Sequence, residues 1–379
     1  MTITYECRIC DPFGRLLASV SNFVDNPTGG GAALGYALNV GNVGALRLTL
    51  PATFDDSLLL LDGRIGVWRS INGRPPTLDG ETVFFIRTWE YTDETTTVTA
   101  YSANHLLTRR IIDYFSGTSY SSKTTATPAG NLIKAFVSEN MLSGIVGADR
   151  QGVETQVDLS AYISNQANLG DGQSIAMQCA WRNLMDVTRE IADASTFAGT
   201  YLAYDVVAPT EDTLQLRTYA NVRGVDHRVG SARPVILSPE TGSLANCRLI
   251  IDRSGEVTFA VAGGGDVGTN RLIATAIDTV RIAESPFNRI ERFGDYKSIT
   301  DPGALQDIAD AMVRAGRPRI EFSADVVETD GATRGIHYDY GDMLTASFRN
   351  KQYDSRLDVI EVAVGGGGQY SRAKIRSLT

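Results

Sequence analysis

The sequence has few of the residues that stabilise small secreted domains or span membranes. It contains four cysteines, at positions 7, 10, 179 and 247, among 379 residues, too few for a disulfide framework. Its longest aliphatic run, residues 58–61, falls far short of the roughly 18 apolar residues that a spanning helix needs. Glu6 interrupts any apolar leader in residues 1–10. We therefore expect a soluble chain with no membrane-spanning segment, made in a reducing compartment.

The sequence also lacks an excess of basic residues. Lysine and arginine together number 35 against 44 aspartates and glutamates, so the formal net charge is −9. Because phosphate backbones attract cations, this balance argues against sequence-specific binding of nucleic acid. It is compatible with a protein that surrounds DNA without retaining it.

Motifs of the common enzyme and metal-site families are absent. The sequence has no G-x-S-x-G, G-x-x-x-x-G-K-[ST], H-E-x-x-H or EF-hand pattern. His105, His227 and His337 are far apart in the chain, and none lies beside a nucleophile motif, so we interpret each as a surface or core residue. Two catalytic carboxylates from distant positions stay open as an alternative. We predict no catalytic, cofactor-binding or metal-binding residue, and hence neither an enzyme nor a cofactor.

Two further patterns could indicate binding, but their context favours a structural role. Cys7 and Cys10 have the spacing of a metal knuckle, yet they lie in a predicted strand, where residues three apart face opposite sides. We interpret them as unpaired structural cysteines and leave open whether they bind anything. Trp68, Trp89 and Trp181 would suit a sugar-binding face, but their one-sided strand and helix positions favour the core.

Glycine is the residue in excess, at 37 against 12 prolines. This is above the usual share of about 7% and indicates many turns between short strands. One glycine-rich segment, residues 263–268, matches the dinucleotide pattern G-x-G-x-x-G. That pattern requires a helix directly after it, whereas residues 269–282 are rich in isoleucine, valine and threonine. We predict a connection between strands.

The first hundred residues predict antiparallel strands. Leu34, Tyr36, Leu38 and Val40 alternate with other residues, and the same period resumes after a glycine turn. The strands expected in this part cover residues 3–10, 34–40, 46–50, 83–89 and 95–101.

The middle of the chain predicts helices and strands together. A polar loop is expected at 116–127, followed by a helix that Thr127 and Pro128 open and Gly144 stops. A second helix is expected at 173–194, with strands at 200–207 and 213–219.

The last third again predicts strands, with one helix. A hairpin is expected with its turn at 252–255, and a helix opened by Asp301 and Pro302 and closed by Gly316. The remaining strands are expected at 272–277, 279–282, 319–327, 342–348, 356–364 and 369–375.

These elements predict a mainly β protein with α+β insertions, built around two small β-barrel-like domains. We expect a first barrel-like domain at 1–108, an α+β domain at 109–235, and a second barrel-like domain at 236–379. The last of these would carry a helix-containing insertion around 285–330. No clean sequence repeat relates the two outer parts.

An ordered series of short segments resembles the tail hub proteins of tailed bacteriophages, also called tail-tip or baseplate hub proteins. Their order carries the resemblance, since no single segment is specific. The segments are 11–16, 43–51, 62–69, 85–90, 97–107 and 109–111, followed in the last third by 263–271, 289–293 and Tyr-Asp-Tyr-Gly-Asp at 338–342.

The resemblance implies a structural virion protein of the distal tail, assembled in the host cytoplasm. It implies a homotrimer whose two barrel-like domains per chain form a ring that continues the tail tube and opens for DNA ejection. The implied partners are the distal tail protein, tail tube and tape-measure proteins, and tail fibre or spike proteins. Because the sequence ends near the last predicted strand, we expect another subunit to recognise the host. Acidic residues are expected to line the passage.

Two other classes remain as alternatives. A β-rich adhesin or carbohydrate-binding module would explain the strands, glycines and aromatic residues equally well. An enzyme on a β-scaffold has no motif in its favour.

Overall fold

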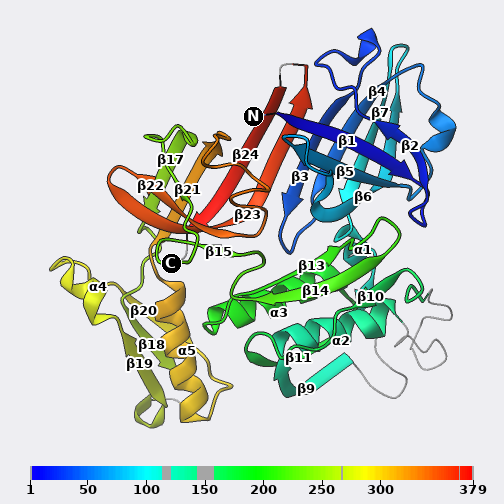
Figure 1. The fold of residues 1–379 in the computed structure, drawn as a ribbon. Helices are drawn as coiled ribbons and strands as arrows, with labels where there is room; N and C mark the ends of the chain where they lie inside the picture. Colours follow the sequence, from blue (N-terminus) through cyan, green and yellow to red (C-terminus); the bar gives the residue numbers. More distant parts are fainter. Residues whose placement is uncertain (1, 113–120, 143–157, 266–267, 367, 378–379) are drawn as a thin grey trace. The chain divides into compact units, whose positions relative to one another are not determined.

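The computed structural model describes residues 2–112, 121–142, 158–265, 268–366 and 368–377 (Figure 1). The chain divides into two compact units. The larger unit comprises Met1–Cys247 and Ser323–Leu378, and the smaller comprises Arg248–Phe322. The predicted division into three domains is a different partition and stays a prediction.

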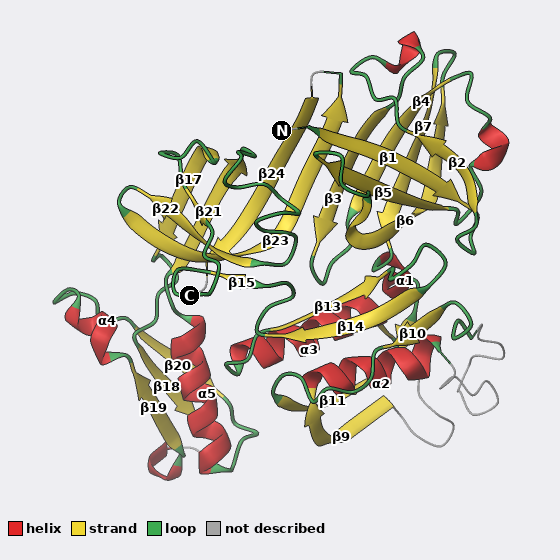
Figure 2. Ribbon diagram, viewed as in Figure 1, coloured by secondary structure: helices red, strands yellow, loops and turns green. Residues whose placement is uncertain are grey.

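Strands dominate the described part of the chain, as Figure 2 shows, with 45% of the described residues in strands and 17% in helices. This confirms the mainly β prediction. The strands of the first hundred residues are β1 (Ile3–Cys10), β2 (Leu16–Val20), β3 (Ala33–Asn39), β4 (Ala45–Pro51), β5 (Arg64–Ile71), β6 (Thr77–Tyr91) and β7 (Thr95–Ser102). Those near the C-terminus are β21 (Arg319–Val326), β22 (Met343–Phe348), β23 (Lys351–Gly365) and β24 (Gly368–Ser377).

One sheet joins the two β-rich ends of the chain. Its strand order is β17-β21-β24-β23-β3-β4-β7-β6-β5-β1-β2, with β17 at Leu244–Asp252. The junction is antiparallel pairing of β3 with β23, in which Tyr36 lies opposite Val362. Short strands β15 (Asp226–His227) and β16 (Ile236–Leu237) pair with β22. The path ends at β2 and β17, so the strands of this sheet form one continuous open sheet rather than two closed barrels.

The expected alternation explains why these strands bury one face. Leu34, Tyr36 and Leu38 of β3 are at most 4% exposed, whereas the residues between them are partly exposed. Side chains of a strand point alternately to the two faces of its sheet, so such a pattern packs one face onto a core.

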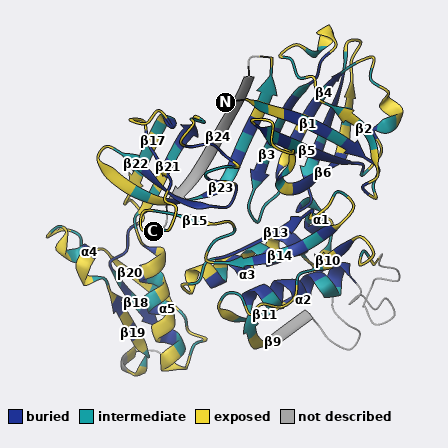
Figure 3. Ribbon diagram, in the orientation of Figure 1, coloured by how far each residue is buried: buried dark blue, intermediate teal, exposed yellow. Residues whose placement is uncertain are grey.

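An α/β layer follows the first strands in the larger unit. Strand β14 (Leu214–Ala220) pairs with β13 (Leu202–Val207) and, in parallel, with β10 (Ile163–Asn165). Helices α2 (Ala129–Met141) and α3 (Leu184–Phe197) share one buried cluster with these strands. Figure 3 shows the buried residues of these elements in dark blue. The same cluster includes Val83 and Phe85 of β6, so this core continues into the first strands. A short helix, α1 (His105–Thr108), connects the two.

The smaller unit is a three-stranded sheet with one long helix. Its strand order is β19 (Ile273–Ile277), β18 (Phe259–Gly263) and β20 (Glu291–Asp295). Helix α5 (Pro302–Ala315) covers one face: its Leu305, Ala309 and Val313 pack against alanines of β18 and β19. As predicted, Asp301 caps this helix by accepting from the N–H of Ala304 at 2.7 Å. No described helix is long and apolar enough to cross a membrane.

Four expectations about which segments form strands, helices or hairpins were wrong. The expected loop at 116–127 is a strand from residue 121 on, β9 (Ser121–Pro128), and residues 116–120 lie outside the described residues. The first half of the expected helix at 173–194 forms β11 (Ser174–Cys179), which pairs with β9, and then β12 (Arg182–Asn183), which pairs with β8 (Ile111–Ile112). Helix α3 begins only after Asn183, whose side chain accepts from the N–H of Met185 at 3.0 Å.

The other two lie in the smaller unit. The expected strand at 279–282 is helix α4 (Thr279–Ala283), because Asp278 accepts from the N–H of Arg281 and caps a helical turn. The expected hairpin across 252–255 does not form, since β18 pairs with β19 and β20 while β17 lies next to β21.

The helix expected after Thr127 exists as α2, but its cap differs. Pro128 occupies the cap position without a side-chain hydrogen bond, and the Thr127 hydroxyl donates to the carbonyl of Thr125 instead. Gly144, expected to stop this helix, lies outside the described residues.

Candidate functional site

The three histidines each make local hydrogen bonds. Nδ1 of His105 lies 2.9 Å from the Thr108 hydroxyl one helical turn away. His227 contacts a backbone carbonyl of its own loop through Nδ1 at 2.8 Å, and His337 accepts from the N–H of Thr333 at 3.0 Å. Burial, together with the positive charges of Arg109 and Arg87, lowers the pKa of His105. These contacts fit the structural interpretation of the three residues.

The glycine-rich segment at 263–268 lies between β18 and β19, and the described residues directly after it form a 3-10 turn, Gly268–Asn270, where a dinucleotide site would need an α-helix. Residues 266–267 lie outside the described part of the chain. The segment is therefore a connection between strands, as its sequence predicted.

The cysteines are free thiols, and three of them are buried. Cys7, Cys10 and Cys179 are at most 6% exposed, whereas Cys247 is half-buried. Burial raises the pKa of Cys10 and of Cys179 to about 11, and it raises the pKa of Cys7 further. In the described part of the chain no three His, Cys, Asp or Glu side chains gather as a metal site would require.

We expect only Cys247 of the native protein to react with iodoacetamide at pH 8. A thiol that is both inaccessible and protonated is a poor nucleophile. Intact-mass spectrometry should detect one adduct on the folded chain and four after denaturation. Cys247→Ser should then give no adduct when folded, and two or more adducts on the native wild type would contradict the burial of the other three.

The tryptophans are more exposed than the sequence suggested. Trp181 is 55% exposed with a φ of 57°, so its assignment to the core was wrong. Trp89 and Trp68 are half-buried. The indole N–H of Trp68 donates to Glu211 at 2.9 Å, and the Arg8 guanidinium lies 4.1 Å from its ring centroid.

Two buried clusters of charged residues, which the sequence analysis missed, connect distant parts of the larger unit. In the first, here the Asp79 cluster, Arg334 donates to both carboxylate oxygens of Asp79 at 2.6 and 2.9 Å. The Tyr36 hydroxyl donates to the same carboxylate, and Arg69 binds both oxygens of Glu328 at 2.6 and 2.8 Å. Burial alone would raise the pKa of Asp79, but the Arg334 guanidinium holds it below its usual value.

The second cluster is centred on Asp205 of β13. Its carboxylate accepts from the guanidinium of Arg223, from the side-chain amide of Asn104 at 2.9 Å and from the N–H of Gly41 at 3.0 Å. Arg223 also donates to the carbonyl of Tyr340 at 3.1 Å, with its guanidinium 4.2 Å from that ring. A charged residue inside the apolar strand Leu202–Val207 was the available sequence signal for this cluster.

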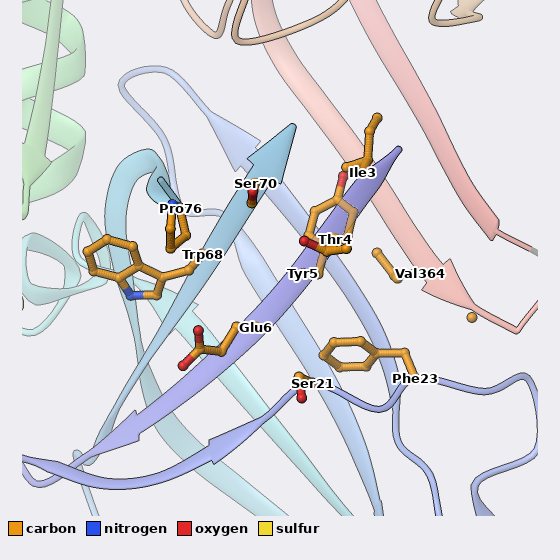
Figure 4. Close-up of a pocket in the computed structure, with 11 residues that line it drawn as sticks. Ile3, Thr4, Tyr5, Glu6, Ser21, Phe23, Trp68, Ser70, Pro76 and Val364 are labelled. Atoms are coloured by element: carbon orange, nitrogen blue, oxygen red, sulfur yellow. The ribbon is translucent and has the colours of Figure 1, made fainter. Parts of the chain in front are cut away.

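A groove lies along the first half of β1 (Figure 4). Its volume is about 550 Å³, and we call it the β1 groove. Phe23 and Val364 lie on one side of β1, and Trp68 and Pro76 lie on the other. The lining residues are Ile3, Thr4, Tyr5, Glu6, Ser21, Phe23, Trp68, Ser70, Pro76, Val364 and Gly365.

The smaller unit has an apolar face that no described helix of that unit covers. On the side of its sheet opposite α5, Ile273 and Ile277 are 54% and 51% exposed and Phe293 is 55% exposed. Arg271 and Arg289 lie over Phe293 and Phe259, at 5.2 and 4.2 Å from the ring centroids. An apolar centre edged by charged residues is the usual composition of a protein-binding surface.

Comparison with known proteins agrees with the predicted resemblance. The model of the Siphovirus ReqiPepy6 Gp37-like protein family matches residues 77–375, well over half of the chain. No curated protein sequence matches the chain.

Solved structures of tail proteins share the fold over nearly their whole length. The 43 kDa tail protein of prophage MuSo2 from Shewanella oneidensis has a TM-score of 0.59 at 10% identity, covering 99% of this chain and 98% of that one. A tail protein from Neisseria meningitidis has a TM-score of 0.55 at 10% identity, covering 100% and 97%. Prophage tail protein gp18 from Listeria monocytogenes has a TM-score of 0.51 at 9% identity, covering 98% and 94%. With its fold shared by these tail proteins and its sequence matched by the family model, this chain belongs to the Siphovirus ReqiPepy6 Gp37-like family of phage tail proteins.

Proposed function

We propose that this protein is the hub at the distal tip of a phage tail, a homotrimer that continues the tail tube and opens for DNA ejection. The observation that supports this most is that nearly the whole chain matches tail proteins of similar length. The role is structural rather than catalytic. Its partners are the distal tail protein, tail tube and tape-measure proteins, and fibre or spike proteins, in a virion assembled in the host cytoplasm.

The buried charged clusters suit a part that transmits force between neighbours. They connect residues up to 265 positions apart in sequence, such as Arg69 and Arg334. Hydrogen-bonded charges without access to water hold one geometry, because any shift leaves a buried charge without its partner. A hub must keep its shape while the tail tube is attached to it.

The net charge of −9 supports a passage for DNA. A wall that carries acidic residues gains nothing from releasing counterions, so DNA would pass without being held. In the assembled ring we expect acidic side chains toward the opening. A lumen lined by lysine and arginine would contradict this part of the proposal.

The proposal is tested by the mass and symmetry of the purified chain. Light scattering should give three times the 40.9 kDa of one chain, and electron microscopy should show a threefold ring with a central hole. A stable monomer that stays monomeric with tail tube and distal tail proteins would contradict the hub. If that monomer bound glycans, the adhesin or carbohydrate-binding alternative would replace it.

We expect the apolar face of the smaller unit to be buried in the assembly. Replacing Ile273 and Ile277 together with lysine should shift the mass toward the monomer, because two charges would have to be desolvated at the contact. Val225→Lys, at a site 56% exposed in the larger unit, is the matched control and should leave the mass unchanged. Circular dichroism should be the same for all variants. An unaltered trimer in the double variant would show that this face is not a subunit contact.

A further inference from the structure

Strand β1 is paired along its full length on one side only. With β5 the register runs from Ile3 opposite Ile71 to Cys10 opposite Arg64. With β2 the pairing begins only at Cys7, opposite Val20. No described strand pairs with residues 3–6 on that second side, so the first half of β1 has a free edge.

The register shows which backbone groups point to this free edge. The N–H of Asn72, which lies next to β5, donates to the carbonyl of Thr2 at 2.8 Å. In an antiparallel pair, successive residues direct their backbone groups to opposite sides, so Thr4 and Glu6 bond toward β5. The N–H and C=O groups of Ile3 and Tyr5 therefore point away from β5.

The free edge lies along the β1 groove. Ile3, Tyr5, Phe23 and Val364 line it, and its volume of about 550 Å³ is in the range of sites that bind small ligands and short segments. Proteins usually protect an open edge with lysine, proline or a bulge. The free half of β1 has none of these, and its one charged residue, Glu6, is paired with Arg8 at 3.0 Å.

We propose that the β1 groove binds an extended peptide segment of a partner protein, which adds to the sheet as a strand beside residues 3–6. The unpaired backbone groups of Ile3 and Tyr5 identify the occupant as a polypeptide, because only a main chain presents donors and acceptors at that spacing. Its alternate side chains would contact Phe23 and Val364 on one face and Thr4 and Glu6 on the other. This inference does not depend on the trimeric hub.

Hydrogen exchange of the free protein tests the edge itself. The amides of Ile3 and Tyr5 should exchange rapidly, while those of Thr4 and Glu6, bonded to β5, should be protected at least about a hundredfold more. Equal protection of all four amides would mean that the edge is already covered, and would overturn the proposal.

Binding is tested with a random heptapeptide library selected on the immobilised full-length chain, followed by Kd measurements with the resynthesised peptides. Ile3→Pro removes one donor from the free edge, and it is tolerated because this N–H has no partner in the sheet and Ile3 is the first residue of β1. We expect Ile3→Pro to weaken binding about five- to tenfold, as for the loss of one hydrogen bond.

Ile3→Val keeps the donor and a similar side chain, and it should bind like the wild type. Phe23→Ser should weaken binding through the side-chain contact, with an unchanged exchange rate at Ile3. Thermal melting of each variant establishes that it is folded. If no peptide is selected, or if Ile3→Pro binds every selected peptide as well as Ile3→Val does, the groove is not a site of strand addition.

Discussion

Arg334→Met is expected to lower the free energy of unfolding of the larger unit by about 3–5 kcal/mol. The side chains of Arg334 and Asp79 are 2% and 5% exposed, and they form two hydrogen bonds with each other. Methionine would keep part of the volume but would leave the Asp79 carboxylate without its main partner. The carboxylate would keep the hydrogen bond from the Tyr36 hydroxyl but would stay almost out of contact with solvent without its two-bond partner, which is why breaking such a pair costs more than breaking a surface pair.

Urea denaturation followed by tryptophan fluorescence measures this loss in the right unit. Trp68, Trp89 and Trp181 all belong to the larger unit, so the signal is independent of unfolding in residues 248–322. The control is Arg47→Met, which removes a pair with Glu90 at 3.9 Å whose side chains are 67% and 65% exposed. It should change the unfolding free energy by less than about 0.5 kcal/mol. Similar losses in the two variants would show that burial of the Asp79 cluster contributes nothing.

The pH dependence of the unfolding free energy distinguishes the effect of an unpaired buried charge from the effect of lost packing. In the wild type the pKa of Asp79 is lowered by Arg334, so its contribution to stability is present at neutral pH and is lost as the pH falls through that lowered pKa. In Arg334→Met the buried carboxyl would have a raised pKa, and protonation would then stabilise the folded state as the pH falls. The deficit of the variant should therefore shrink between pH 7 and pH 5. A constant deficit would point to packing alone.

Phe136→Ala is expected to cost about 3–5 kcal/mol in the same measurement. Phe136 of α2 has no exposed surface and belongs to the cluster that α2 and α3 form with β13 and β14. Removing the ring takes away buried apolar area and leaves a cavity that the surrounding helices and strands fill only partly.

Phe197→Ala is the matched control for this substitution. Phe197 is the last residue of α3, in the same α/β layer, but it is 68% exposed. Its loss should change stability by no more than about 0.5 kcal/mol. If the two variants were equally stable, α2 would not be packed against its sheet as the structure has it.

Local patterns were sufficient to predict much of the secondary structure. The alternation in β3 and β4 and the capping Asp301 of α5 depend on residues adjacent in sequence, and the structure confirms them. The errors occurred where a distant strand decides the conformation. Residues 174–179 were expected to be helical because Met177 lies at helical spacing from Trp181 and Leu184, yet they pair with β9, which lies about 50 positions earlier in the chain. A stretch of sequence as long as one or two helical turns contains no residue of so distant a strand, so it cannot indicate the pairing.

The candidate sites were even less accessible to sequence reasoning. Asp79 and Arg334 are 255 positions apart, and neither belongs to a motif. The free edge of β1 exists because β2 pairs only with the second half of β1. Neither the amino-acid composition nor the spacing of apolar residues indicates where that pairing stops. The run at 338–342 contributes to the resemblance to tail hub proteins, but only the structure shows that the Arg223 guanidinium lies over the ring of Tyr340 in the Asp205 cluster.

The sequence by itself determined that this is an acidic, mainly β chain without recognisable catalytic motifs, and the order of its short segments identified a phage tail family. These properties depend on composition and on residues near one another along the chain. Only the tertiary structure decided that β3 pairs with β23 and so joins both ends of the chain in one open sheet. It also decided that charged residues far apart in sequence, such as Asp79 and Arg334, form buried hydrogen bonds, and that half of β1 has an unpaired edge. Each of these results from long-range pairing, in which the partner of a residue is chosen by the packing of the whole unit rather than by its neighbours in sequence.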